Sequence, residues 1–425
     1  MRPWNKVRVA GGTFSLNKEK KFFGFGKNVF VAGLVSFFMD VSSEMVYPLV
    51  PLFLANVLGV NKSVIGLIEG VAESTASLLK VFSGWFSDRI GNRKWLMATG
   101  YGISTLSRPI VALAMGWQHV MGSRFMDRFG KGVRTAPRDA IIAESSESAF
   151  LGRAFSFHRS LDTMGAVVGP ALAFFFLGIF SNNFRTVFWL SMIPGAIAVL
   201  LIILFIKEKK KNRERSLENS VIPPNPPLLK GGRGGLFDWR FKFFVAIATL
   251  FAIGNSSDVF LILRAQQIGI PALMIPIVYL LFNLIYSLSA IPAGIAADRF
   301  GRKRVMLLGF GLFAVLYYGF AIAGNTTTIW VLFGFYGLFM GLTEGIQKAF
   351  LATIIPSDFK ATAFGVYNTA VGLAMLPASL IGGWLWDNVS PSATFYFGAI
   401  TAALSAVLFV IYIIAIRKDV LKTKV

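Results

Sequence analysis

Long apolar blocks alternate with short polar segments over most of the chain. A helix needs about 20 mostly apolar residues to cross a hydrocarbon core of about 30 Å, and the blocks have about that length. The pattern therefore predicts an all-α integral membrane protein with about 12 transmembrane helices. We expect these helices near residues 28–59, 64–87, 94–116, 119–143, 153–180, 185–206, 241–268, 271–297, 303–324, 328–354, 362–386 and 392–416.

The composition supports this class. The chain has 425 residues, of which 55% are hydrophobic and 15% are charged, whereas a soluble domain is usually about a quarter charged. It has no cysteine, which excludes a disulfide framework, a thiolate metal site and a cysteine nucleophile. The N-terminus lacks the compact pattern of a cleaved secretory signal, so we interpret the first apolar block as a retained span.

The net charge of +21 comes mostly from Lys and Arg in the N-terminal tail and in alternate loops. The intervening loops hold almost none, with Lys62 and Arg185 as the exceptions. This asymmetry follows the positive-inside rule and predicts that both termini lie in the cytoplasm. The basic charge thus indicates orientation and anionic headgroups, not a nucleic acid partner. We expect a multi-pass protein of a plasma membrane, such as a bacterial inner membrane.

The two halves of the chain resemble each other. GWFSDRIGNRK, residues 84–94, recurs as GIAADRFGRKR, residues 294–304. DVSSEM is echoed by GNSSDV, and RAFSFHRS by TAFGVYNT, at offsets near 210 residues. An even number of spans in each half lets both halves enter the membrane from the same side, as parallel repeats do.

Between the halves, residues 207–235 are charged, then Pro-rich, then Gly-rich, a composition that cannot bury a core. The sequence therefore predicts two related bundles of about six helices joined by a cytoplasmic linker. The expected divisions are a basic tail at 1–27, a first bundle at 28–206, the linker at 207–240, a second bundle at 241–416 and a tail at 417–425.

The repeated loop carries a resemblance to a known family. Its pattern is similar to G-x-x-x-D-R-x-G-R-[RK]-[RK], the signature of major facilitator superfamily (MFS) transporters, with Asn92 departing at one basic position of the first copy. The resemblance implies two pseudo-symmetric bundles of six helices that rock about a central cavity, with this loop as a gate. The matching positions are Gly84, Asp88, Arg89, Gly91 and Arg93, then Gly294, Asp298, Arg299, Gly301 and Arg302.

A small residue in such a loop lets two helices approach, and a glycine supports a tight turn. The carboxylate can cap another helix or pair with an arginine, so breaking and remaking its contacts would gate the bundles. An ordinary basic loop with a turn is the other interpretation, and the two copies at matching positions favour the gate.

A second motif resembles the fifth-helix sequence G-x-x-x-G-P-x-x-G-G of proton-linked exporters. Gly165, Gly169 and Pro170 match, whereas Ala173 and Phe174 replace the closing glycines. The alternative is a close-packed, kinked helix, which Gly and Pro produce in any membrane bundle.

Ionisable residues within the apolar blocks are the main candidates for function, because a charge inside a span is costly unless it faces a polar cavity or a partner. Arg124, Arg128 and Lys131 form one cationic stripe on the fourth helix, and Asp40 and Glu44 share a face of the first. For a transporter we expect proton-coupling and substrate-cavity residues to be Asp40, Glu44, Glu73, Arg108, Arg124, Asp127, Arg128, His158, Arg159, Asp162, Asp258 and Glu344.

Two carboxylates on one face in a low-dielectric cavity cannot both ionise cheaply, so at least one is expected to hold a proton. Asp40 and Glu44 are therefore the first candidates for proton coupling, with Arg124 or Arg128 as counter-charge. The alternative is that they form permanent salt bridges with the fourth-helix cations. His158 titrates in a useful range, although a lone membrane histidine is more often a packing and hydrogen-bonding residue.

These features favour a secondary transporter that moves a small solute by alternating access. The activity that we expect is proton-coupled efflux of an organic anion, a metal chelate or a drug-like compound. Proton-coupled uptake and a transport-dead receptor of the same fold are the alternatives. The chain has no phosphate-binding loop, no filter-like repeat and no catalytic motif, which argues against an ATPase, a channel and an enzyme. We expect no cofactor, no bound metal, no nucleic acid partner, and a monomer in the lipid bilayer.

Overall fold

The computed structural model describes residues 26–90, 92–146, 151–207, 238–355 and 360–422. It describes their side chains except at residues 80–90, 151–153, 348, 352, 360–362 and 418–422. The predicted linker and basic N-terminal tail therefore lie almost entirely outside the described residues.

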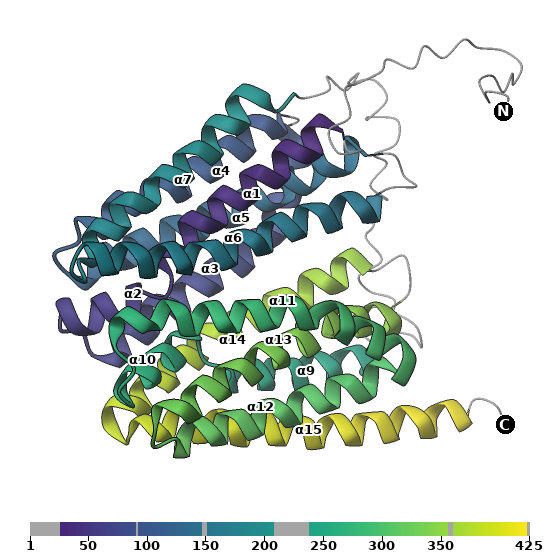
Figure 1. The fold of residues 1–425 in the computed structure, drawn as a ribbon. Coiled ribbons are helices and arrows are strands. Elements are labelled where there is room, and N and C mark those ends of the chain that lie inside the picture. The colour runs from purple at the N-terminus through teal and green to yellow at the C-terminus, as the bar shows by residue number, and fades with distance from the viewer. Residues whose placement is uncertain (1–25, 91, 147–150, 208–237, 356–359, 423–425) are drawn as a thin grey trace, which may run out of the picture.

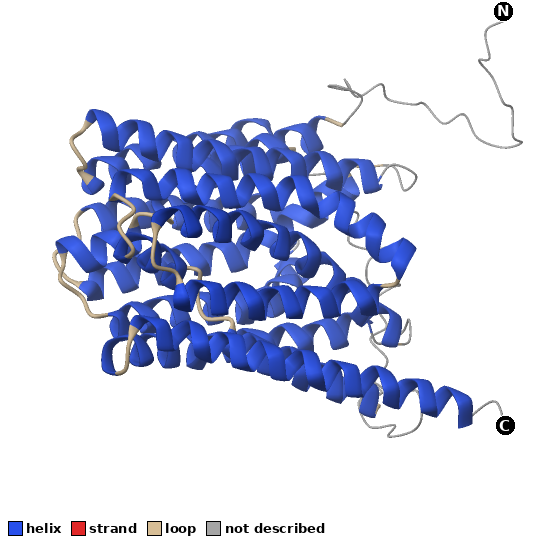
Figure 2. Ribbon diagram, turned by 60° about the horizontal axis from the view of Figure 1, so that its bottom comes forward, coloured by secondary structure: helices blue, strands red, loops and turns tan. Residues whose placement is uncertain are grey.

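The described residues form helices and no strand, arranged as two packed bundles (Figures 1 and 2). The first bundle contains α1 (Lys27–Val46), α2 (Val50–Leu52), the π-helix η1 (Phe53–Val57), α3 (Lys62–Ile90), α4 (Arg93–Ala112), α5 (Trp117–Glu144), α6 (Leu151–Ile179) and α7 (Phe184–Phe205). The second contains α9 (Trp239–Gly254), α10 (Val259–Gln267), the 3-10 helix η3 (Ala272–Met274), α11 (Ile275–Phe300), α12 (Arg302–Ile322), α13 (Thr326–Ile354), α14 (Lys360–Asn388) and α15 (Pro391–Lys422). The all-α membrane fold predicted from hydropathy is confirmed.

The first span of each bundle is interrupted at a matching place. In the first bundle the α-helix breaks at Tyr47–Leu49, which includes Pro48, and in the second it breaks at Asn255–Asp258. The breaks are about 210 residues apart, the offset of the sequence repeat. Interrupted spans are common where a transporter builds its binding site, because the break exposes polar groups near the middle of the membrane.

Within the described part of the chain, nine helical segments are long and apolar enough to cross a membrane. The spans absent from this group are α3, α4 and α5, all in the first bundle. These helices are too polar to face lipid on all sides, so their polar faces must meet other protein groups.

Arg185 and Arg264 each close the end of a neighbouring helix. The Arg185 guanidinium donates to the carbonyl oxygens of Ala112 and Ala114 at 2.6 and 2.7 Å, beyond the last turn of α4. Arg264 donates to the carbonyls of Phe320 and Ala321 at 3.0 and 2.9 Å, at the end of α12. The unpaired carbonyls and negative dipole at a helix C-terminus favour a cation there. This contact explains Arg185 as an exception to the loop charge pattern.

The two bundles meet along α3 and α14 and along α6 and α11. Small residues bring α3 and α14 close: a Cβ added to Gly70 would lie 3.0 Å from Leu376 Cα. At the end opposite the termini, Asp387 of α14 accepts hydrogen bonds from the backbone N–H groups of Lys62 and Ser63 at 3.1 and 2.6 Å. Ser63 Oγ also donates to Asp387 at 2.7 Å. The second bundle thus caps the N-terminus of α3 in the first.

Candidate functional site

Two parallel ion pairs join α3 to α5 in the first bundle. Arg124 binds Glu69 in a bidentate manner, with Nε–Oε1 at 2.9 Å and an N–O distance of 2.6 Å for the second contact. Arg128 binds Glu73 at 2.6 Å one turn further along both helices. The Arg124 and Glu69 side chains are almost fully buried, whereas Glu73 is 28% exposed. Buried charges persist only when they are paired, and here the pairs lock α3 against α5.

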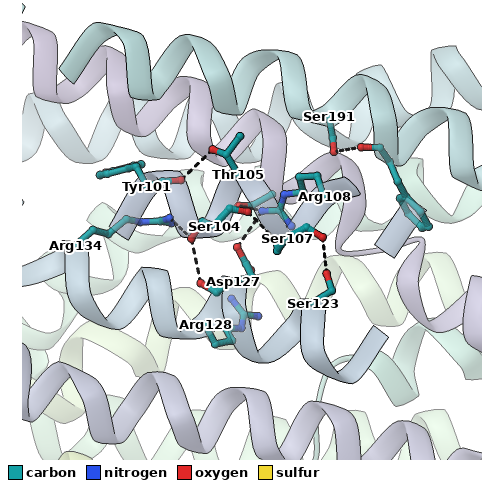
Figure 3. Close-up of polar contacts among 12 residues, drawn as sticks. Tyr101, Ser104, Thr105, Ser107, Arg108, Ser123, Asp127, Arg128, Arg134 and Ser191 are labelled. Carbon is teal, nitrogen blue, oxygen red and sulfur yellow. Dashed lines mark hydrogen bonds and ion pairs between the residues drawn. The ribbon is translucent and has the colours of Figure 1, made fainter. Parts of the chain in front are cut away.

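A third ion pair joins α4 to α5 (Figure 3). The Arg108 guanidinium donates to Asp127 at 3.0 Å and to Ser43 Oγ of α1 at 2.9 Å. Beside this pair, Arg134 donates to Ser104 Oγ at 2.6 Å. The polar side chains of α4 and α5 therefore form ion pairs and hydrogen bonds with each other inside the bundle. This explains why these helices do not need apolar surfaces on every side.

Tyr47 lies where the first span breaks and covers the cations of α5. Its ring centre is 5.2 Å from the Arg124 guanidinium carbon and 5.8 Å from that of Arg128. The same ring contacts Tyr279 of α11, with centroids 5.4 Å apart. An aromatic ring over a guanidinium is attractive through its quadrupole. Tyr47 therefore places the cationic stripe at the boundary with the second bundle.

The acids of α1 lie against α6 rather than against the α5 cations. The Asp40 carboxyl group lies within hydrogen-bonding reach of the Asp162 carboxyl group of α6. Within the described residues, Glu44 Oε2 is buried without a hydrogen-bond partner. α6 can approach because a Cβ on Gly165 would lie 2.9 Å from Asp40 Cβ, and one on Gly169 would lie 2.8 Å from Glu44 Cβ.

The expected counter-charge for the α1 acids is therefore corrected. Among the described residues, Arg124 and Arg128 form their ion pairs with Glu69 and Glu73, not with Asp40 or Glu44. The cations still act on Glu44 at longer range, with Lys131 the strongest of them. The physical reason is the orientation of α5 about its own axis. The cationic stripe of α5 points toward α3, and α1 lies to one side of it.

His158 has a hydrogen-bonding role in this conformation. The side chain is buried, and its Nε2 lies 2.6 Å from Ser36 Oγ of α1. Ser36 Oγ also lies 3.4 Å from the Tyr101 hydroxyl of α4. His158 therefore ties α6 to α1 one turn before Asp162.

One chain of polar contacts crosses from the first bundle to the second. Arg159 binds Asp162 at 3.1 Å and donates to the Tyr286 hydroxyl of α11 at 3.1 Å. Tyr286 in turn donates to Glu344 of α13. The Asp40–Asp162 pair is thus linked through one arginine to an acid of the other bundle.

Asp258 of the second bundle lies at the other break. It accepts a hydrogen bond of 2.7 Å from the Tyr336 hydroxyl of α13. Glu69 and Glu73 are close enough to act on it electrostatically. Asp258 also acts electrostatically on Tyr47 at the first break, so the two breaks lie near each other at the bundle boundary. Over the described residues, no group of three or more His, Cys, Asp and Glu side chains is arranged to hold a metal ion.

A family comparison assigns this architecture. The model of the Major Facilitator Superfamily matches residues 32–263 and 243–424. The chain belongs to the Major Facilitator Superfamily. An uncharacterised MFS-type transporter of Methanocaldococcus jannaschii is 35% identical over 388 residues, which are 90% of this chain and 94% of the relative. The chain is therefore a multi-pass membrane protein of a transporter family.

Two further similarities are informative at different levels. The proton-coupled antiporter flippase LtaA of Staphylococcus saprophyticus is 31% identical over 121 residues, which are 28% of this chain and 30% of LtaA. The crystal structure of a POT family transporter in complex with 5-aminolevulinic acid superposes with a TM-score of 0.75. It is 13% identical and covers 93% of this chain and 97% of its own, so it supports the fold alone.

The MFS signature loops are only partly visible. In the first copy Gly91 and the side chains of Gly84, Asp88 and Arg89 lie outside the described residues, and Arg93 pairs with Glu144. In the second copy Gly301 has a φ of 93°, the left-handed turn that the glycine predicts.

The second loop meets one expectation and differs from another. A Cβ on Gly294 would meet nothing within 4 Å, so the expected close helix contact is not made there. Asp298 lies 3.4 Å from Arg302 and is 73% exposed, so of the two contacts expected for this carboxylate it makes the one with an arginine. The role of this loop as a gate stays a prediction.

The predicted site did not include several residues that form the observed contacts: Glu69, Tyr47, Arg134 and Tyr286 in the site itself, and Asp387 at the end of the bundle boundary. For Glu69 a signal is present. Glu69 and Glu73 are four residues apart on one helix, as Arg124 and Arg128 are on another. Two matched pairs at helical spacing predict two parallel ion pairs. Tyr286 and Asp387 contact the other bundle, and no local pattern indicates that.

Proposed function

We propose that this protein is a proton-coupled secondary transporter that exports a small solute by alternating access. The observation that carries the proposal is the close approach of the Asp40 and Asp162 carboxyl groups, which lie within hydrogen-bonding reach of each other. An ionised carboxylate only accepts hydrogen bonds, so two carboxyl groups bond to each other only when they share a proton. This approach supports the proposal that the pair holds an exchangeable proton inside the membrane region.

The contacts around Asp40 and Asp162 favour a proton that is taken up and released over a proton that is held permanently. The α5 arginines are occupied by Glu69 and Glu73, so they do not hold the α1 acids permanently ionised. Arg159 binds Asp162 and also reaches Tyr286 of the second bundle. Loss of the shared proton would strengthen the hold of Asp162 on Arg159, which couples protonation to a contact between the bundles.

The export direction is supported by two features. Gly165 and Gly169, which resemble the exporter motif, are the positions at which α6 packs on Asp40 and Glu44. The partial relative LtaA is a proton-coupled antiporter by name. We infer a solute that is an organic anion, a metal chelate or a drug-like compound, and a location in the inner membrane with both termini in the cytoplasm.

The test uses purified protein in liposomes. A thermal-shift panel of organic anions, ethidium and metal–citrate chelates first identifies a solute that stabilises the protein. Asp40→Asn should still bind that solute, because the asparagine keeps the side-chain size. It should lose pH-driven transport by at least about tenfold, since the shared proton is gone. Asp238→Asn, at the start of α9, is the matched control and should transport normally.

Unchanged pH-driven flux in Asp40→Asn vesicles would reject the coupling role. If a proton gradient directed into solute-loaded vesicles accelerates the efflux of the solute, the result supports export. Accumulation of the solute along the proton gradient would instead make the protein an uptake symporter.

A further inference from the structure

A basic cavity lies beside the turn between α11 and α12, at the end of the molecule where α1 begins and α15 ends (Figure 1). Its volume is about 680 Å³. It is lined by the turn itself and by Phe350 and Thr353 of α13. The charged side chains that line it are Asp298, Arg299, Arg302, Lys303 and Arg304.

The cations of this cavity exceed its acids. Arg302 is engaged, since it binds Asp298 at 3.4 Å and the Ala349 carbonyl at 3.2 Å. Among the described residues, Arg299, Lys303 and Arg304 form no ion pair. The first copy of the loop differs here, because its Arg93 is neutralised by Glu144. A hollow lined by unpaired cations attracts an anion with several oxygens, such as a phosphate group.

The two helices that carry these cations, α11 and α12, each expose a stripe of apolar side chains that runs along the helix away from the cavity. On α11, Leu288, Ile291 and Ile295 precede Arg299 at steps of three or four residues and are 68%, 74% and 64% exposed. Residues spaced in this way lie on one face of a helix. The Arg299 side chain therefore stands at the end of a face that the membrane lipids cover.

The same arrangement recurs on α12. Arg304 is followed by Leu308, Val315 and Tyr318 at helical spacing, and these side chains are 66%, 67% and 53% exposed. Two lipid-facing stripes therefore end at one basic hollow. A soluble phosphate would use the hollow alone, whereas a phospholipid would use both the hollow and the stripes.

We propose that this cavity binds the phosphate-bearing headgroup of an anionic phospholipid, whose acyl chains lie along the exposed faces of α11 and α12. Each unpaired arginine near an anionic lipid surface strengthens binding by about fivefold. The bound lipid would hold the α11–α12 turn against α13. The proposal is independent of the transported solute and of the direction of transport.

The experiment measures lipid retention by the full-length protein. Delipidated protein is exchanged into micelles that contain equal amounts of phosphatidylglycerol and phosphatidylcholine, and bound lipids are counted by native mass spectrometry. The wild type should retain phosphatidylglycerol in preference. Arg299→Ala/Arg304→Ala should weaken that retention by about fivefold for each arginine removed, whereas Arg299→Lys/Arg304→Lys should keep most of it.

The matched control removes two cations from the same end of the molecule but outside the cavity. Lys207→Ala/Arg417→Ala changes the net charge equally and should retain phosphatidylglycerol as the wild type does. An equal loss in this control would overturn the proposal, because the preference would then reflect overall charge. The proposal also fails if the wild type shows no lipid preference, or if millimolar inorganic phosphate displaces the lipid, which would assign the cavity to a soluble anion.

Discussion

The two bundles share one fold and one sequence repeat, but their interiors use different chemistry. The first is held by buried ion pairs between α3, α4 and α5, with Arg108, Arg124 and Arg128 as the cations. The second is held by aromatic rings. Phe313 of α12, for example, lies 4.9 Å from the ring of Phe251 and 3.9 Å from that of Tyr317, centroid to centroid.

This difference shows which half can respond to charge. Aromatic packing is insensitive to protonation, so we expect the second bundle to move as a rigid body. The first bundle contains the Asp40–Asp162 pair, for which we propose a shared proton, beside a network of ion pairs, and a change in one charge alters the balance of its neighbours. A moving pair of bundles needs only one of them to sense the proton.

The largest expected effect comes from breaking a buried pair in the first bundle. Arg124→Leu leaves Glu69 buried and unpaired, and it should lower the free energy of unfolding by about 3–5 kcal/mol. The measurement is an SDS titration of the purified protein in mixed micelles. The double variant Glu69→Leu/Arg124→Leu should recover most of this loss, because two apolar side chains replace the pair.

The double variant should nevertheless transport poorly, since the charges would then be missing from the boundary at Tyr47. If the double variant is as unstable as the single one, the pair is a packing element and the contrast between the bundles is weaker than proposed. If Arg124→Leu loses no stability at all, Glu69 has another partner or is neutral.

The helices themselves could be predicted from hydropathy, and the interruptions could not. The prediction for residues 303–324 corresponds to α12, Arg302–Ile322. The last helix was expected to end at 416 but extends to Lys422, because hydropathy marks the membrane-embedded part and not the end of the helix. The break at Tyr47–Leu49 lies inside an apolar run, and the polar segment Asn255–Asp258 is too short to divide its apolar block in a hydropathy pattern.

The sequence predicts which residues belong to the candidate site better than it predicts which of them contact each other. Buried ionisable residues stand out because their cost requires a partner or a cavity, which is how Asp40, Asp162 and Arg128 are found. Which acid meets which arginine depends on the rotation and packing of each helix, and a single sequence does not encode this directly. The expected pairing of α5 with α1 was wrong for this reason.

An intermediate effect on stability is expected where both bundles use an arginine to cap the C-terminus of a neighbouring helix. Arg264 bonds more groups than Arg185 does, since it also reaches Gln267 and Ser392 at 2.9 and 3.3 Å. A lysine cannot reproduce the planar fork of a guanidinium. Arg264→Lys should therefore lower the free energy of unfolding by about 2 kcal/mol, and Arg185→Lys by about 1 kcal/mol.

Both variants are measured in the same SDS titration, with Arg417→Lys, an exposed position at the other end, as the control without effect. Equal losses at Arg185 and Arg264 would mean that the extra bonds of Arg264 add nothing to stability. A larger loss at Arg185 would reverse the comparison and make the first bundle the one that depends on its helix cap.

The smallest effect is expected in the aromatic interior of the second bundle. Phe313→Leu keeps an apolar side chain of similar size but removes the ring contacts to Phe251, Tyr317 and Phe339, so it should cost about 1 kcal/mol. The exposed Phe335→Leu on α13 is the matched control and should change nothing. The informative readout is transport, because a rigid partner should tolerate this loss with normal pH dependence. A shifted pH profile in Phe313→Leu vesicles would show that the second bundle also senses the proton, and the division of roles between the two bundles would have to be abandoned.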